Sequence, residues 1–85
     1  MRTLVTSHAP LNLYQADTST ALKVLLIQGG WETRHCFNEM GIHSGDRVRV
    51  LRKAPFGGPL VIENQGTQVA IGKQLAEKVQ VKVLP

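Results

Sequence analysis

The sequence has few aromatic residues, one cysteine and no long apolar run. Aromatic residues make up 5% of the 85 residues although 42% are hydrophobic, so the core must be built from aliphatic side chains on short elements. Cys36 stands alone, which excludes an internal disulfide framework and fits a reducing cytosol. No apolar stretch approaches the roughly 20 residues that span a bilayer. We therefore expect a cytoplasmic protein without direct insertion into a membrane.

The residue sets that catalysis requires are also missing. A nucleophile needs a positioned base and an orienting third group, and no serine has such local support. Gly29-Gly30 and Gly57-Gly58 are not phosphate cradles, because neither pair is followed by the Lys-Ser/Thr of a phosphate-binding loop. A chain this short also has a thin core, which leaves little room for a cleft. We expect no enzymatic activity and no cofactor.

The basic residues are concentrated in one stretch of a chain whose formal net charge is +4. Four of the ten basic residues lie within seven positions, namely Arg47, Arg49, Arg52 and Lys53. Aromatic residues do not alternate with these cations, and no helix has a basic recognition face, which argues against nucleic-acid binding. We prefer a solvated strand face, with contact to an acidic protein surface as an intermediate possibility. A nucleic-acid-binding small barrel remains the alternative.

Local patterns predict a mainly β domain at residues 11–85, after a flexible leader at residues 1–10. Residues 11–16 are expected to form a turn of helix or an irregular lead-in. The alternation in Arg47-Val48-Arg49-Val50 predicts a half-buried strand. The expected strands are 20–28, 47–53, 59–65, 67–71 and 79–83, with a helix at 31–40 and a short helix at 73–78. Since five short strands are too few for a sandwich, they predict a small, strongly bent β-barrel that hides strand edges.

Residues 55–59, Pro-Phe-Gly-Gly-Pro, must form a turn. The prolines lack backbone donors and the glycines can take positive φ. We expect a barrel corner where glycine relieves crowding and Phe56 caps the core. A rigid turn also loses little entropy on binding a partner. The expected docking surface therefore combines the turn with the basic strand, through Pro55, Phe56, Pro59, Arg47, Arg49, Arg52 and Lys53.

Potential metal ligands gather on the predicted helix at 31–40. Spacings of three and four place Glu32, His35, Cys36 and Glu39 on adjacent helical positions, and His43 follows the helix. Two or three could share a cation, but a selective site would repeat its ligands at a fixed geometry. We expect at most adventitious binding of a transition metal, with His35, Glu39 and His43 as weak candidates. Cys36 is expected to be a small core residue.

An ordered series of motifs between residues 13 and 83 resembles one known family. The strongest are Met40-Gly41-Ile42, Gly45-Asp46, residues 48–53, residues 54–59, Val69-Ala70-Ile71-Gly72 and a final Val-x-Val strand. Together they resemble the FeoA family of small bacterial proteins associated with ferrous iron uptake. The resemblance implies an SH3-like β-barrel, a cytoplasmic location and a partnership with FeoB, the membrane protein that carries ferrous iron inward and has a cytosolic GTP-binding domain. On this basis we expect the docking surface to meet an acidic or apolar patch of FeoB.

One departure from the family pattern lies in the predicted helix. The family commonly has an Arg-Leu pair where Cys36 and Phe37 stand here, although Arg34 could reach a similar region. The barrel is also similar in shape to one appended to iron-dependent repressors of the diphtheria-toxin-repressor type. Since no winged-helix segment precedes it in this sequence, we expect no repressor function. A direct metal chaperone is the weakest of the functions considered.

Overall fold

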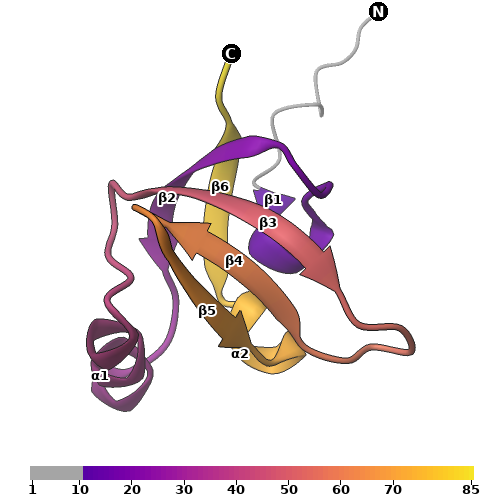
Figure 1. Ribbon diagram of the computed structural model, residues 1–85. Helices are drawn as coiled ribbons and strands as arrows, with labels where there is room; N and C mark the ends of the chain where they lie inside the picture. Colours follow the sequence, from indigo (N-terminus) through magenta and orange to yellow (C-terminus); the bar gives the residue numbers. More distant parts are fainter. Residues whose placement is uncertain (1–10) are drawn as a thin grey trace, which may run out of the picture.

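The computed structural model describes residues 11–85, in which six antiparallel strands form one strongly bent sheet (Figure 1). The strand order is β1-β6-β2-β3-β4-β5. The strands are β1 (Leu11–Asn12), β2 (Ala21–Ile27), β3 (Arg47–Lys53), β4 (Leu60–Asn64), β5 (Thr67–Ile71) and β6 (Val79–Val83). Three helical segments accompany them, the 3-10 turn η2 (Leu13–Gln15), α1 (Trp31–Met40) and α2 (Lys73–Ala76). The leader expected at residues 1–10 lies outside the described residues.

The predicted mainly β barrel is confirmed, but the expected number of strands is wrong. The sixth strand is β1, where Leu11 pairs with Val81 and Asn12 with Gln80. Two residues are too few to show an alternation, so this strand could not be recognised locally. The turn of helix expected in the same segment is present as η2, which contacts both α2 and β6. Through η2, β6 is thus connected to α2, which directly follows β5 in the chain.

The core is aliphatic, as the composition predicts, with one large ring at its centre. Phe37 of α1 is fully buried, and Ile42 just after the helix is 1% exposed. On α1 the half-buried Thr33, Cys36 and Met40 lie on the predicted apolar face, while the polar positions are exposed. Gly41 ends the helix at φ +79°, and its N–H donates to the carbonyls of Phe37 and Asn38. The helix is therefore anchored to the barrel through one narrow face.

Most element boundaries follow the local pattern. The bounds of α1, β3, β5 and β6 are those predicted, whereas β2 and β4 are one residue shorter at each end and α2 ends at Ala76. Bulges interrupt the pairing between Val24 and Leu26 in β2 and between Val50 and Arg52 in β3. The first bulge leaves both Leu25 and Leu26 about half exposed. Within residues 11–85, no helix has the length and apolarity needed to cross a bilayer.

Candidate functional site

The hairpin between β3 and β4 projects from the barrel (Figure 1), and its connecting turn contains Phe56. Phe56 and Gly57 have φ values of +60° and +73°. The Gly58 N–H donates to the Pro55 carbonyl at 3.2 Å, and the Ala54 N–H donates to the Pro59 carbonyl at 2.8 Å. Positive φ at both central residues is the pattern of a type I′ turn, which continues the twist of the two strands. The turn therefore extends the ladder outward.

The expectation that Phe56 caps the core is wrong. Its relative exposure is 101%, because the type I′ turn directs the apex away from the barrel. The predicted relief of crowding by glycine is confirmed at Gly58, where a Cβ atom would lie 2.7 Å from the Ala54 Cβ. The turn thus has a tight backbone and an aromatic ring that contributes nothing to the core.

Tyr14 of η2 holds the base of this hairpin. Its hydroxyl donates to the Gly58 carbonyl at 3.2 Å, and the Lys53 ammonium donates to the Tyr14 carbonyl at 2.7 Å. The ammonium groups of Lys53 and Lys73 lie 5.5 and 5.7 Å from the centre of the Tyr14 ring, within the range of cation–π attraction. Lys53 is therefore engaged beside η2 at the hairpin base.

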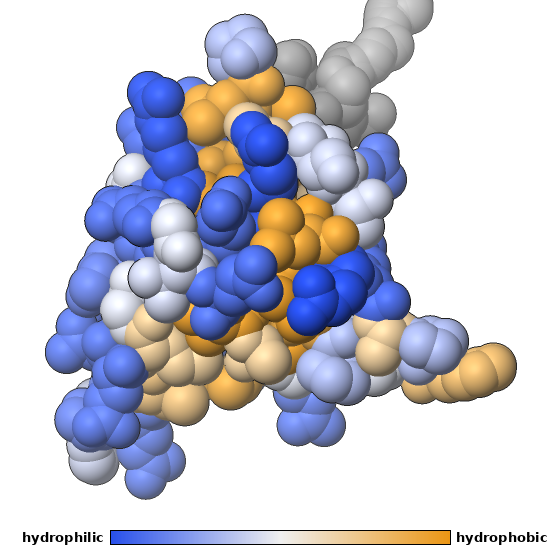
Figure 2. Space-filling view, in the orientation of Figure 1, coloured by the Kyte–Doolittle hydropathy of each residue, from blue (hydrophilic) through white to orange (hydrophobic). Residues whose placement is uncertain are grey.

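Three arginines share the outer face of β3. Arg47 and Arg49 are exposed while Val48 and Val50 are buried, as the alternation predicts. Arg49 lies opposite Glu63 and Arg52 opposite Val61. Glu63 and Val61 are two residues apart on β4 and therefore share a face of the sheet. Their partners Arg49 and Arg52 share that face as well, because the bulge adds one residue between them. Figure 2 shows that the surface over β3 and β4 is mostly hydrophilic, with a hydrophobic patch among the hydrophilic side chains.

A row of cations crosses the sheet beside these arginines. In the strand register, Lys23 of β2 lies directly opposite Lys82 of β6 on one side and Arg47 of β3 on the other. Like charges placed opposite each other destabilise a sheet. Within the described part of the chain, a carboxylate lies within 4.0 Å of a basic side chain only at His35–Glu39 and His43–Asp46. No carboxylate of residues 11–85 is therefore in direct contact with Lys82, Lys23 or Arg47, which we call the cationic row.

The sequence analysis missed Lys23 and Lys82. The charge clustering along the chain identified only the stretch 47–53. The two lysines join it through the pairing of distant strands, which no local signal reveals. The structure thus brings Arg47, Arg49 and Arg52 together on one face, adds Lys23 and Lys82, and places Lys53 apart at the hairpin base.

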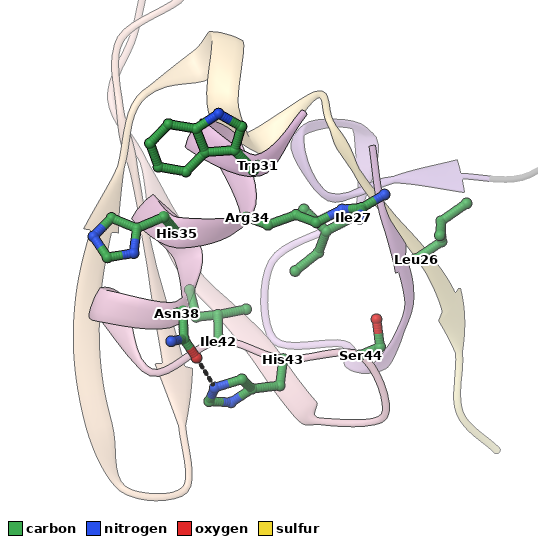
Figure 3. A pocket seen from close by; sticks show the side chains of 9 residues that line it. All are labelled: Leu26, Ile27, Trp31, Arg34, His35, Asn38, Ile42, His43 and Ser44. Atoms are coloured by element: carbon green, nitrogen blue, oxygen red, sulfur yellow. Dashed lines mark hydrogen bonds between the residues drawn. The ribbon is translucent and has the colours of Figure 1, made fainter. Parts of the chain in front are cut away.

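A second surface feature, also missed, is a groove of about 550 Å³ between α1, the end of β2 and residues 42–44 (Figure 3). Trp31 is 74% exposed and Leu26 is 48% exposed beside it. On α1 its wall follows the spacing i, i+3, i+4, i+7, the period of one helix face. That spacing is visible in the sequence as Trp31, Arg34, His35 and Asn38. We call this feature the α1 groove; its remaining lining residues are Ile27, Ile42, His43 and Ser44.

A polar network fixes the lower wall of the α1 groove. The buried Asn64 donates through Nδ2 to the Gly41 carbonyl at 2.9 Å and to Asp46 Oδ2 at 3.1 Å. The same Asp46 oxygen accepts the His43 N–H at 2.9 Å. A hydrogen bond of 2.8 Å joins His43 Nε2 to Asn38 Oδ1 (Figure 3). The end of α1, the turn before β3 and the end of β4 are therefore held as one unit.

The weak metal candidates are divided between two pairs. His35 Nε2 lies 3.6 Å from Glu39 Oε2, and His43 Nδ1 lies 3.7 Å from Asp46 Oδ2. Glu32 is exposed, and Cys36 is half-buried rather than fully in the core. Across residues 11–85, no three His, Cys, Asp or Glu side chains gather closely enough to hold a metal ion. The predicted candidates thus form no cluster with one another in the described chain.

Comparisons with known proteins agree with this geometry. Residues 11–83 match the family model described as the FeoA domain. A Methanocaldococcus jannaschii protein assigned as Fe(2+) transport protein A is 40% identical over 43 residues, which span 51% of this chain and 50% of that protein. The match thus covers half the length of this relative.

Solved structures extend the likeness to most of the chain. The crystal structure of an iron uptake regulatory protein, FeoA, is 33% identical with a TM-score of 0.82, covering 89% of this chain and 100% of that one. The FeoA-like protein from Clostridium acetobutylicum is 26% identical with a TM-score of 0.80, covering 89% and 88%. A manganese-dependent transcriptional repressor is 23% identical with a TM-score of 0.82 over 37% of its own chain, which shows the fold alone. The implied SH3-like barrel is confirmed, and the chain belongs to the FeoA domain family.

Proposed function

We propose that this protein is a non-enzymatic, cytoplasmic accessory protein of ferrous iron uptake that docks onto the cytosolic domain of FeoB. Membership of the FeoA domain family supports the process. The names of two relatives, an Fe(2+) transport protein A and an iron uptake regulatory protein, point in the same direction. Docking is the proposed mode of action because the exposed features of the described chain are those of a contact surface.

The observation that carries this proposal is the conformation of Phe56. A bulky residue at φ +60° occupies a region that disfavours side chains by roughly 1–2 kcal/mol, and the ring is fully exposed. The positive φ belongs to the type I′ turn that closes the hairpin, whereas the exposed ring adds nothing to the core. An aromatic side chain on a rigid turn is also well suited to anchor an interface, since little entropy is lost when a partner binds.

The cations beside the hairpin supply the second part of the proposed surface. Arg47, Arg49 and Arg52 share the outer face of β3, and the cationic row extends it across β2 and β6. Clustered charges of one sign speed the approach of an oppositely charged partner and fix its orientation. We propose that Phe56, with Pro55 and Pro59, provides an apolar anchor while the arginines face an acidic patch of FeoB. Lys53 contributes by holding the hairpin base.

The sharpest test is the substitution Phe56→Asn, measured as binding to the FeoB cytosolic domain by isothermal titration calorimetry. Asn tolerates positive φ, so the turn is retained while the ring is removed. We expect affinity to fall by tenfold or more, as for an interface hot spot, with the urea midpoint unchanged or raised. Gln65→Asn is the matched control, because Gln65 occupies another exposed turn at φ +54°. Unchanged affinity of a folded Phe56→Asn protein would refute the docking role.

Charge reversal tests the electrostatic part. Arg49→Glu/Arg52→Glu is expected to slow association with FeoB and to reduce its dependence on salt. The wild-type protein should also be titrated with DNA and RNA. Binding to nucleic acid that weakens steeply with salt, without binding to FeoB, would favour the alternative small barrel that uses the basic strand.

A further inference from the structure

We infer that the α1 groove is a docking site for an acidic peptide segment of a second macromolecule, in which an apolar side chain stands beside a carboxylate. The groove lies beside α1, and the Phe56 hairpin projects from a different part of the barrel (Figure 1). The inference therefore goes beyond the proposed docking to FeoB through the hairpin and does not depend on it. With both surfaces in use, the protein would connect two macromolecules.

The apolar part of the groove has no structural explanation within the described chain. Trp31 and Leu26 are 74% and 48% exposed, although both are large hydrophobic residues. They face a hollow whose base includes Ile27 and Ile42, at 8% and 1% exposure. A tryptophan that offers both ring and N–H is typical of contact surfaces. A hydrophobic side chain placed here would cover part of this exposed apolar surface.

The charged part of the groove selects an acidic occupant. The lining residue with a permanent charge is Arg34, and the lining contains no Asp or Glu. The nearby carboxylates already have neighbours, Glu39 at His35 and Asp46 at His43. Within residues 11–85, Arg34 has no carboxylate at ion-pair distance. Figure 3 shows its side chain extending from α1 toward β2, where the guanidinium can bind a carboxylate through two hydrogen bonds.

The size and rigidity of the groove suit a short segment. A volume of about 550 Å³ lies within the range of roughly 300–1,000 Å³ typical of binding pockets. The hydrogen bonds that Asn64 donates and the Asp46 carboxylate accepts hold the wall at the end of α1 in place before binding. Such preorganisation lowers the entropy lost on association. A few residues of peptide would fill this space without a rearrangement of the barrel.

Trp31 makes the proposal directly testable, because it is the only tryptophan in the chain. The full protein is titrated with the blocked peptide Asp-Leu-Phe-Asp-Leu while the tryptophan emission is followed. Burial of the exposed Trp31 ring should shift its emission to shorter wavelength in a saturable manner. Arg34→Gln should raise the Kd about tenfold, whereas the matched control Arg49→Gln, on the outer face of β3, should leave it unchanged. Circular dichroism confirms that each variant is folded.

Further outcomes would overturn the proposal. The neutral peptide Asn-Leu-Phe-Asn-Leu should bind at least several-fold more weakly, and equal binding would remove the role of Arg34. An emission shift that follows protein concentration alone would show that a second copy of the chain fills the groove. Absence of any shift, or a Kd that responds to Arg49→Gln instead of Arg34→Gln, would exclude the site. Because no FeoB is present in the titration, these results are distinct from the hairpin test.

Discussion

At the scale of single residues, Asn64 shows how one buried amide can join three elements. Its Nδ2 atom donates to the Gly41 carbonyl after α1 and to Asp46 before β3, while Asn64 itself ends β4. Its Oδ1 atom is buried without a hydrogen-bond partner. Both hydrogen bonds are donated by Nδ2, so Asn64 stabilises the fold through the two acceptors that it satisfies, the Gly41 carbonyl and the Asp46 carboxylate.

We predict that Asn64→Ala lowers the free energy of unfolding by about 1–3 kcal/mol, because it leaves the Gly41 carbonyl and the Asp46 carboxylate without this donor. Asn64→Asp should be worse, since it places a second carboxylate beside Asp46. Urea denaturation followed by circular dichroism measures both. Gln68→Ala on the exposed side of β5 is the control and should change stability by less than about 0.5 kcal/mol. Equal stability of Asn64→Ala and Gln68→Ala would contradict the proposed role of the network.

The exposure of particular side chains was the least predictable property at this scale. Val48 and Val50 were correctly assigned to the core because their alternation is local. Phe56 was not, because hydrophobicity favours burial and the sequence does not state that two successive residues take positive φ. The exposure of Leu26 could not be predicted either, because Leu26 lies in an apolar run and the direction of its side chain is set by a bulge.

At the scale of elements, regular segments were predictable and their pairing was not. The bounds of α1, β3, β5 and β6 follow from periodicity and from glycine or turn residues at their ends. The two-residue strand β1 and the cationic row depend on contacts between distant parts of the chain. The α1 groove depends on how α1 lies against β2, so only the helix face that lines it was visible in advance.

The link between η2 and the β3–β4 hairpin gives a prediction for Tyr14→Phe. The substitution keeps the ring and the lysines around it but removes the hydrogen bond from the Tyr14 hydroxyl to the Gly58 carbonyl. We expect a loss of about 0.5–1.5 kcal/mol in stability and faster hydrogen exchange of the Ala54 and Gly58 amides, which close the hairpin.

Affinity for FeoB should fall less in Tyr14→Phe than in Phe56→Asn, since the anchor ring remains in place. Amide exchange measured by NMR reports how far the hairpin is loosened, which separates this effect from loss of the aromatic anchor. If the hairpin amides exchanged at the same rate in Tyr14→Phe and in the wild type, the Tyr14 hydrogen bond would not be what holds the base of the hairpin.

At the scale of the whole molecule, the placement of like charges across the sheet works against stability. The formal net charge is +4, and in the described chain Lys23 lies directly opposite both Lys82 and Arg47, with no carboxylate within ion-pair distance of the three. Natural sheets usually place opposite charges in such positions, because these stabilise the pairing of strands. Functional surfaces commonly trade stability for activity, and the cationic row fits the docking role proposed for this surface.

This trade-off predicts opposite effects of Lys23→Glu on stability and on binding. The new carboxylate would face Lys82 and Arg47 and should raise the free energy of unfolding by about 0.2–1 kcal/mol for each opposite-charge pair. Affinity for FeoB should fall at low salt, because a cation is lost from the proposed surface. Lys78→Glu makes the same change in net charge outside the row and should lower both properties little. If Lys23→Glu affected stability and binding no differently from Lys78→Glu, only net charge would matter, and the cationic row would have no role of its own.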